Sequence, residues 1–305
     1  MKAVIPAAGK GTRMYPVTNN GEVSKEMLPI NDDGLSAIEY TLMRALASGV
    51  TQVTVVSSEA KRDLNEFLAS LKSDPVINEV LEIDIVMQQS ANGLGDAFCY
   101  GATRRGAGAS IADDLSDGDP FLGILPDDLF VTDDMMTLSC PVIEQLVETL
   151  KKGKNGIGTM VVPDELVPSY GIVKFRTKSN GSHGRPIDFI EKPSIEEAPS
   201  NYAVAGMYAF QPSIVAEIDT TQPDGKGEIQ ITNAMRSHLR SGERYKAITL
   251  GDRVTRHDIG RPEGYEAFRH FVRGWEAKGA SLGSLHELSQ TLQVGRVNSS
   301  QPMTL

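Results

Sequence analysis

Short, mostly apolar runs recur along the first half of the chain, and turn-forming or polar residues bound each of them. Four such runs lie at 3–6, 53–56, 83–87 and 121–125. Runs of this length are typical of strands that are buried on both faces of a parallel sheet. The pattern therefore predicts four strands of one sheet in this region.

Two segments between these runs have the periodicity of amphipathic helices. Apolar residues share one face over 38–46, directly after Ser36, whose hydroxyl can cap a helix. A second apolar face repeats at helical spacing over 64–71. Strands that alternate with helices form βαβ units. We therefore expect an α/β protein with a Rossmann-like mixed, mostly parallel sheet and helices on both of its faces.

In the second half of the chain, strand-like runs follow one another with little helix between them. These runs lie at 157–162, 171–175, 186–190 and 203–210. Such a series indicates a second part elaborated on the same sheet. We expect one large domain over residues 1–278, with halves at about 1–155 and 156–278. The polar tail at 279–305 is expected to be a loosely docked helix with a frayed end.

Charge and cysteine content narrow the classes of partner. The chain has 305 residues with 30 Lys and Arg against 40 Asp and Glu, a net charge of −10. Nucleic acids and anionic membranes require a basic face, so this balance argues against both as general partners. No apolar run approaches the roughly 18 residues of a membrane span. Cys99 and Cys140 form no Cys-x-x-Cys pair or His/Cys cluster, which predicts reduced thiols and a cytoplasmic protein.

A glycine loop follows the first run directly, since residues 7–14 read Ala-Ala-Gly-Lys-Gly-Thr-Arg-Met. Its glycines allow the backbone to approach an anion closely, and Lys10 and Arg13 add positive charge. The loop is a candidate polyphosphate cradle, although a tight strand-to-helix turn explains the glycines equally well. Met14 stands where a dinucleotide fingerprint has its third glycine, and no Gly-Lys-Ser/Thr follows. A nicotinamide dehydrogenase and a P-loop ATPase are therefore disfavoured.

The loop is part of a longer pattern. Residues 9–18 read Gly-x-Gly-Thr-Arg-x-x-Pro-x-Thr, and residues 25–30 read Lys-Glu-Met-Leu-Pro-Ile. This combination resembles the nucleotidyltransferase superfamily that couples a sugar 1-phosphate to a nucleoside triphosphate. The Lys-Glu-Met-Leu-Pro form is similar to the bacterial-type UTP:glucose-1-phosphate uridylyltransferases, or UDP-glucose pyrophosphorylases.

Further blocks follow in the family's order and extend the resemblance over roughly residues 2–272. They begin with a base-reading segment at 88–97 and a metal-binding block at 125–127. A sugar-side strand at 170–173 and a sugar-phosphate clamp at 190–193 follow. Two further blocks at 201–210 and 227–234 and a second acidic position at 258–260 complete the series. The resemblance implies the nucleotide-diphospho-sugar transferase fold. Its first half would bind the nucleotide and its second half the sugar.

The resemblance also implies a role for individual residues. The catalytic residues would be Arg13 and Lys25. The nucleotide-binding residues would be Ala7, Ala8, Gly9, Gly11, Thr12, Gln88 and Gly93. The sugar-phosphate-binding residues would be Gly171, Glu191, Lys192 and Gly206. The ligands of Mg²⁺, the implied cofactor, would be Asp127 and Asp258.

The position of Asp127 agrees with a ligand site on physical grounds. It follows the run at 121–125 as the glycine loop follows the first run, and ligands bind outside the carboxyl ends of parallel strands. Two separated carboxylates such as Asp127 and Asp258 suit Mg²⁺ when substrate phosphates and waters complete its shell. We expect the neighbouring Asp128 to be solvated. The five histidines have no metal or triad spacing, so none is assigned to catalysis.

The implied reaction converts UTP and glucose 1-phosphate into UDP-glucose and pyrophosphate. The sugar phosphate is already an anionic nucleophile that can attack the α-phosphorus in line, so catalysis requires positioning and charge neutralisation. A glucose-1-phosphate thymidylyltransferase or related sugar-1-phosphate nucleotidyltransferase fits the same residues, since a Gln edge reads uracil and thymine alike. A non-catalytic sugar-nucleotide sensor is the alternative of another class. The resemblance further implies a homo-oligomer, a dimer or a tetramer.

Overall fold

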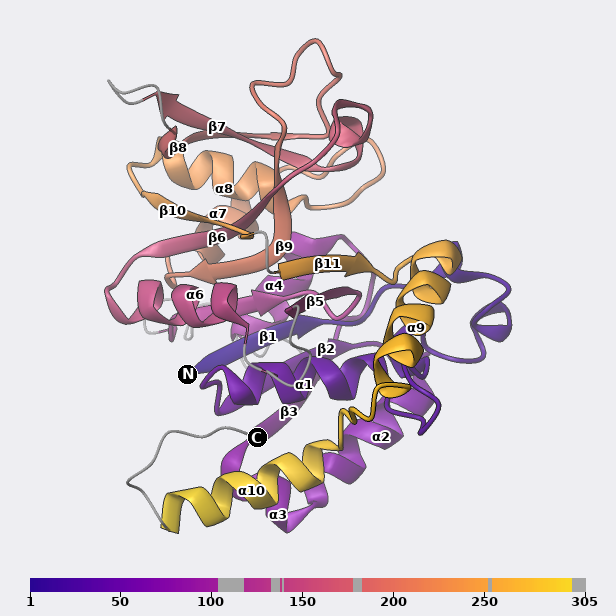
Figure 1. Cartoon of the computed structure of the whole chain (residues 1–305). Helices are drawn as coiled ribbons and strands as arrows, with labels where there is room; N and C mark the ends of the chain where they lie inside the picture. Colours follow the sequence, from indigo (N-terminus) through magenta and orange to yellow (C-terminus); the bar gives the residue numbers. More distant parts are fainter. Residues whose placement is uncertain (104–117, 133–137, 139, 178–182, 252–253, 298–305) are drawn as a thin grey trace.

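Figure 1 shows a computed structural model of the chain, which describes residues 1–103, 118–132, 138, 140–177, 183–251 and 254–297. A mixed sheet runs through the molecule, and helices pack against both of its faces. This arrangement confirms the predicted fold class.

The four strands predicted in the first half are all present, and they are parallel. They are β1 (Lys2–Pro6), β2 (Gln52–Ser57), β3 (Glu82–Met87) and β4 (Phe121–Ile124), in the spatial order β4-β1-β2-β3. Within β1, Ile5 belongs to the hydrophobic core on one face of the sheet and Val4 to the core on the other. Because successive side chains of a strand point to opposite faces, a strand covered on both sides is apolar throughout.

Helices of the first half cover both faces of these strands. They are α1 (Ala37–Ala47), α2 (Arg62–Ser73), α3 (Pro75–Val80) and α4 (Leu94–Thr103). The predicted cap of α1 is confirmed, because the Ser36 hydroxyl accepts a hydrogen bond from the backbone N–H of Glu39 at 3.3 Å. On the face opposite α1, α4 lies so close to β1 and β2 that a β-carbon on Gly101 would collide with Val4 and Val56.

The strand-like runs of the second half are also strands. They are β6 (Asn155–Val161), β7 (Gly171–Thr177), β8 (His183–Glu191) and β9 (Tyr202–Phe210). β9 is antiparallel to both β4 and β6, so it joins the two halves into one sheet. β7 pairs with β8 and β9, while β10 (Tyr245–Thr249) is parallel to β6 at the sheet edge. Three more helices are α6 (Pro141–Lys151), which precedes β6, and α7 (Ile214–Thr220) and α8 (Ile231–Arg240), which follow β9.

A separate two-stranded ribbon, which the sequence did not predict, stands beside the main sheet (Figure 1). In it β5 (Asp128–Thr132) is antiparallel to β11 (Val254–Asp258), and Asp128 lies opposite Asp258. The paired strands are far apart in the sequence, so no local pattern marks them as partners. The ribbon brings acids from two distant segments to one place.

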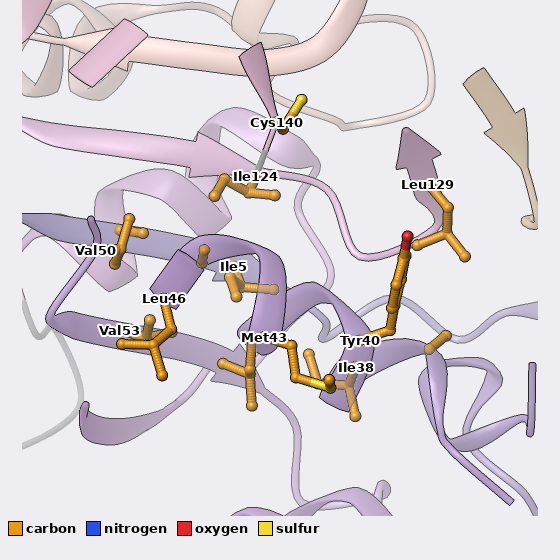
Figure 2. Close-up of a cluster of buried hydrophobic side chains, with 14 of the residues drawn as sticks. Ile5, Ile38, Tyr40, Met43, Leu46, Val50, Val53, Ile124, Leu129 and Cys140 are labelled. Carbon is orange, nitrogen blue, oxygen red and sulfur yellow. The ribbon is translucent and has the colours of Figure 1, made fainter. Parts of the chain in front are cut away.

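The hydrophobic cores form where helices meet the sheet. Figure 2 shows Ile38, Met43 and Leu46 of α1 next to Ile5 of β1 and Val53 of β2. The opposite core is rich in aromatic rings that pack edge to face, with those of Phe98 and Tyr208 5.4 Å apart. Both cysteines are buried free thiols, as the sequence predicts.

Two helices complete the chain, α9 (Pro262–Glu276) and α10 (Leu285–Val297). α10 packs against α3 and α1, and Leu285 and Ser289 are fully buried. His286 is hydrogen-bonded through Nδ1 to the Asp74 carboxylate at 2.7 Å. The expected helix is therefore present, but its inner face forms part of the core, so its docking is not loose, and the expected frayed end at 298–305 lies outside the described residues. In the part of the chain that the structure describes, no helix combines the length and apolar character that a membrane crossing requires.

Candidate active site

Two clefts meet at Arg13, which lines both of them. The loop cleft, of about 990 Å³, is lined by residues 8–13 together with Lys25 and Gln88. The ribbon cleft, of about 510 Å³, lies beside the β5–β11 ribbon and is lined by its carboxylates and by residues of β7, β8 and β9. Arg13 can therefore act on ligands in either cleft.

The glycine loop forms the floor of the loop cleft. Ala7 is held to the core, since its N–H donates to the carbonyl of Val56 at 2.7 Å, and the cleft begins at Ala8. Gly11 has φ +65° before the short turn Thr12–Met14. This left-handed conformation favours glycine, and the stem of Lys25 passes 3.6 Å from the place of a β-carbon there. The loop thus supports Lys25 as well as lining the cleft.

Lys25 forms an ion pair with Asp127 between the two clefts. Burial lowers the pKa of Lys25, but the Asp127 and Glu26 carboxylates outweigh it, so the pKa lies above its ordinary value. Burial likewise raises the pKa of the Asp127 carboxyl, and the Lys25 ammonium more than reverses this, leaving that pKa below its usual range. Both groups are therefore charged at neutral pH.

Asp127 and Asp258 each place a carboxylate oxygen beside Gly260. Oδ2 of Asp127 and Oδ1 of Asp258 lie 3.0 and 3.1 Å from the point that a β-carbon on Gly260 would occupy. The Gly260 N–H donates to the same Asp258 oxygen at 2.9 Å, which orients that carboxylate. Carboxylate oxygens are the ligands Mg²⁺ prefers, with waters and phosphates completing its shell. These residues fit Mg²⁺ once Lys25 releases Asp127.

Asp128 is buried, which contradicts the expectation that it is solvated. Its side chain is 9% exposed and forms an ion pair with Arg256 of β11. Burial raises its pKa to about 7; Arg256 opposes this, while Asp127 and Asp258 add to it. The side chain turns inward because alternate residues of a strand face opposite ways, and Gly206 of β9 leaves the space that it fills.

Gln88 lines the loop cleft at the end of β3, where a base-reading residue is expected. Its side chain is buried, and its amide nitrogen donates to Oδ2 of Asp96 at 2.6 Å. Its backbone N–H donates to the carbonyl of Ser57 at 2.8 Å. Asp96 therefore fixes the rotamer of Gln88 and uses one of its donors.

Gly93 lies against Ile229 and not along the lining of either cleft. It has φ +100°, and a β-carbon there would come within 2.7 Å of the Ile229 backbone nitrogen. The N–H of Ile229 donates to the carbonyl of Asn92 at 2.6 Å, and its carbonyl accepts from Gly95 at 2.9 Å. The glycines at 93 and 95 permit this close backbone contact with Ile229.

The proposed sugar-phosphate residues gather at the ribbon cleft. Glu191 ends β8, and its Oε1 pairs with the Lys192 ammonium at 2.8 Å. Lys192 has φ +44°, and its N–H donates to the carbonyl of Tyr170 at 3.0 Å. Gly171 and Gly206 line the same cleft, where side chains would collide with Thr232 and Asp128 respectively. The structure thus brings all four sugar-side residues together.

With this geometry established, comparison with known proteins gives the family. The model of the nucleotidyl transferase family matches residues 2–276. The chain belongs to the nucleotidyl transferase family.

Three relatives of this nucleotidyl transferase, one curated and two solved as structures, have names that describe the same activity. UTP–glucose-1-phosphate uridylyltransferase 1 of Streptococcus pyogenes serotype M1 is 30% identical over 285 residues, which cover 87% of this chain and 86% of the relative. A UDP-glucose pyrophosphorylase solved with UDP-glucose is 31% identical, with a TM-score of 0.72 and coverage of 90% and 98%. A UTP-bound UGPase from Acinetobacter baumannii is 25% identical, with a TM-score of 0.70 and coverage of 96% and 98%.

Sequence reasoning missed several residues of this nucleotidyl transferase site. Arg256 pairs with Asp128 and donates to the Tyr170 hydroxyl at 3.1 Å, with its guanidinium over the Tyr170 ring. Its spacing from Asp258 was the available signal, since residues i and i+2 of a strand share a face. Glu228 lines the loop cleft and Gln230 the ribbon cleft.

Proposed function

We propose that this nucleotidyl transferase transfers the uridylyl group of UTP to glucose 1-phosphate, giving UDP-glucose and pyrophosphate. The observation that carries the proposal is the junction of the clefts: Arg13 lines both, and the Lys25–Asp127 pair lies between them. A triphosphate over the glycine loop and a sugar phosphate near Lys192 would bring their reacting groups together there. The names of its relatives give the substrates.

Each residue near the junction has a defined task in this proposal. Arg13 and Lys25 neutralise charge that develops on the phosphates as the bond to pyrophosphate breaks. Lys192 binds the incoming phosphate, and Glu191 orients its ammonium through the 2.8 Å ion pair. Gln88 reads the uracil edge from the position in which Asp96 holds it. The attacking oxygen is already anionic, so no side chain has to remove a proton from it.

We further propose that Mg²⁺ is the cofactor and that Asp127 and Asp258 hold it. The position of both carboxylates beside Gly260 and the oxygen-only donor set support this assignment. When bound, the ion would supply Lewis-acid neutralisation of the α-phosphate. The two carboxylates reach the ion from different elements, so the ribbon must form before the site exists.

The experiment that tests the substrates measures pyrophosphate release by the whole chain with Mg²⁺. UTP, dTTP, ATP, GTP and CTP are each combined with glucose, galactose, mannose and N-acetylglucosamine 1-phosphates. UTP with glucose 1-phosphate should give the highest kcat/KM. A preference for dTTP would instead assign the thymidylyltransferase activity. If the protein binds UDP-glucose tightly but releases pyrophosphate from no pair of substrates, the result would favour the non-catalytic sugar-nucleotide sensor.

The expected homo-oligomer, dimer or tetramer, stays a prediction, as does the cytoplasmic location. Light scattering coupled to size-exclusion chromatography distinguishes a monomer of 33.0 kDa from either assembly. Cell fractionation with an antibody against the chain tests the location.

A further inference from the structure

Glu26 is a buried acid beside Lys25 that the proposed function does not use. Its side chain is 1% exposed, and Oε2 accepts a hydrogen bond from the Lys61 ammonium at 2.6 Å. Within the described part of the chain, Oε1 is buried without a hydrogen-bond partner. The Lys25 ammonium lies 4.0 Å from that oxygen. A buried carboxylate oxygen without a hydrogen bond costs free energy, so this arrangement calls for a reason.

The Lys25 ammonium thus contacts two carboxylates. It is bonded to Asp127 and lies 4.0 Å from the unsatisfied oxygen of Glu26. Its stem passes Gly11, where the point that a β-carbon would occupy lies 3.6 Å from both Cγ and Cδ of the lysine, and both carboxylates are within 4.0 Å of its Nζ. A change of partner therefore requires only a small movement of the ammonium.

The two carboxylates differ in what else they can bind. Asp127 lines the ribbon cleft and, like Asp258, places a carboxylate oxygen beside Gly260, and such oxygens are ligands that Mg²⁺ prefers. Glu26 is fixed by Lys61 and is closed to solvent. A divalent ion at Asp127 and the Lys25 ammonium compete for the same carboxylate, since like charges repel at such short range.

We propose that Glu26 is the positioning residue of Lys25: it receives the ammonium when Asp127 binds a divalent ion and keeps it at the edge of the loop cleft. This inference rests on the proposed function only in taking Asp127 as a metal ligand. Lys61 holds Glu26 in place and offsets its charge. Without Glu26, metal binding would leave the displaced ammonium without a buried counter-charge.

The test is a double-mutant cycle on the affinity of the protein for Mn²⁺ in the absence of nucleotide and sugar. Electron paramagnetic resonance of the free ion measures how much Mn²⁺ is bound. Lys25→Met keeps the size of the side chain and removes the competing cation, so Mn²⁺ should bind about 10-fold more tightly. Glu26→Gln leaves the ammonium with Asp127 as its only carboxylate, so Mn²⁺ should bind about 5- to 10-fold more weakly. In the double variant, Glu26→Gln should have no further effect.

The double variant separates a positioning role from a structural one. If Glu26 only anchored its segment to Lys61, Glu26→Gln would weaken Mn²⁺ binding equally with Lys25 or with Met at position 25. That result overturns the proposal, as does an unchanged affinity in Glu26→Gln. Absence of Mn²⁺ binding to the wild-type chain at millimolar concentration also overturns it.

Two controls keep the result interpretable. Asp127→Asn should abolish Mn²⁺ binding, which shows that the ion counted is the one at Asp127; retained binding overturns the proposal. If Glu26→Gln lowers the melting temperature, the cycle is repeated with Glu26→Gln/Lys61→Met in place of Glu26→Gln, because this double replacement leaves neither member of the buried pair charged. The substrate matrix uses the wild-type enzyme and no variant, so a different nucleotide preference would revise the proposed function and leave this cycle standing.

Discussion

Asp127 and Asp128 are neighbours in the chain, yet their carboxylates have different surroundings. Asp127 pairs with Lys25 between the clefts, while Asp128 pairs with Arg256 and is packed against Gly206. The Lys25 ammonium lowers the pKa of Asp127, whereas burial raises that of Asp128 to about 7. The two carboxylates have different surroundings because β5 begins at Asp128. Successive side chains of a strand point in opposite directions, so those of Asp127 and Asp128 leave the backbone on different sides.

The proposed metal ligands give the first prediction. Asp127→Asn or Asp258→Asn should lower kcat by roughly 10²-fold or more, because an amide oxygen neutralises a cation less well than a carboxylate. Steady-state pyrophosphate release at saturating Mg²⁺ measures the effect, with circular dichroism as the folding control. Near-normal kcat in both variants would remove these residues from the metal site.

At the scale of elements, close contacts determine how helices sit on the sheet. α4 approaches β1 and β2 at Gly101, and α7, α8 and β10 are joined by one buried histidine. His238 of α8 is hydrogen-bonded to the Tyr245 hydroxyl of β10 at 2.8 Å and to the Ser213 hydroxyl before α7 at 2.9 Å. None of the five histidines was assigned to catalysis, and this one is a packing residue that lines neither cleft.

Gly101→Ala is predicted to destabilise the protein although alanine is the better helix former. The new methyl group would collide with Val4 and Val56, so the free energy of unfolding should fall by about 1–3 kcal/mol. Gly274→Ala in α9 is the matched control, since among the described residues no atom outside its own stretch of helix lies within 4 Å of its β-carbon position. That variant should gain about 0.5–1 kcal/mol. Urea unfolding measures both, and equal effects would refute the contact at Gly101.

The lowered pKa of His238 predicts how the free energy of unfolding depends on pH. Burial lowers its pKa below the ordinary 6.5, so near that pH the unfolded chain binds more protons than the folded one. The stabilisation is therefore present above pH 6.5 and is lost as the pH falls through the lowered pKa. Urea unfolding from about pH 7 to about pH 5 should show a steeper loss for wild type than for His238→Gln. Parallel curves would show that another group is responsible.

On the scale of the whole molecule, β9 joins the two halves and also lines the ribbon cleft. β9 is antiparallel to β4 on one side and to β6 on the other. The loop cleft belongs mainly to the first half, whereas β7, β8 and β9 line the ribbon cleft. One continuous sheet therefore holds both proposed substrates in a fixed relative position, which is what in-line transfer requires.

The separation of the clefts predicts separate kinetic defects. Gln88→Ala should raise KM for UTP and weaken the preference over CTP, since an unpaired buried polar edge costs about 1–3 kcal/mol. KM for glucose 1-phosphate should stay within a few fold. Lys192→Ala should do the reverse, through loss of a charge-assisted contact worth about 1.5–3 kcal/mol.

Kinetics with each substrate varied in turn test this separation. Lys174→Ala, an exposed lysine of β7 outside both clefts, is the control and should change neither KM. Lys192→Ala impairing only UTP, or Gln88→Ala impairing only glucose 1-phosphate, would contradict the assignment of the clefts.

The eight strands predicted in the sequence analysis are all present. They could be predicted because each is covered on at least one face, which leaves an apolar pattern within the strand itself. The helices at 37–47 and 62–73 were found for the same reason, with Ser36 marking the start of the first. β5, β10 and β11 were missed. Their lengths match those of β1 and β4, but their pairing partners are distant in the sequence, as with Asp258 opposite Asp128.

The sequence by itself determined which residues carry charge near the glycine loop and in what order the proposed site residues follow along the chain. The tertiary structure decided which of them meet. It paired Lys25 with Asp127, buried Asp128 against Arg256 and left one oxygen of Glu26 facing the Lys25 ammonium. These outcomes depend on burial and on charges from distant segments, because the field and solvent exposure at a side chain are set by every element packed around it.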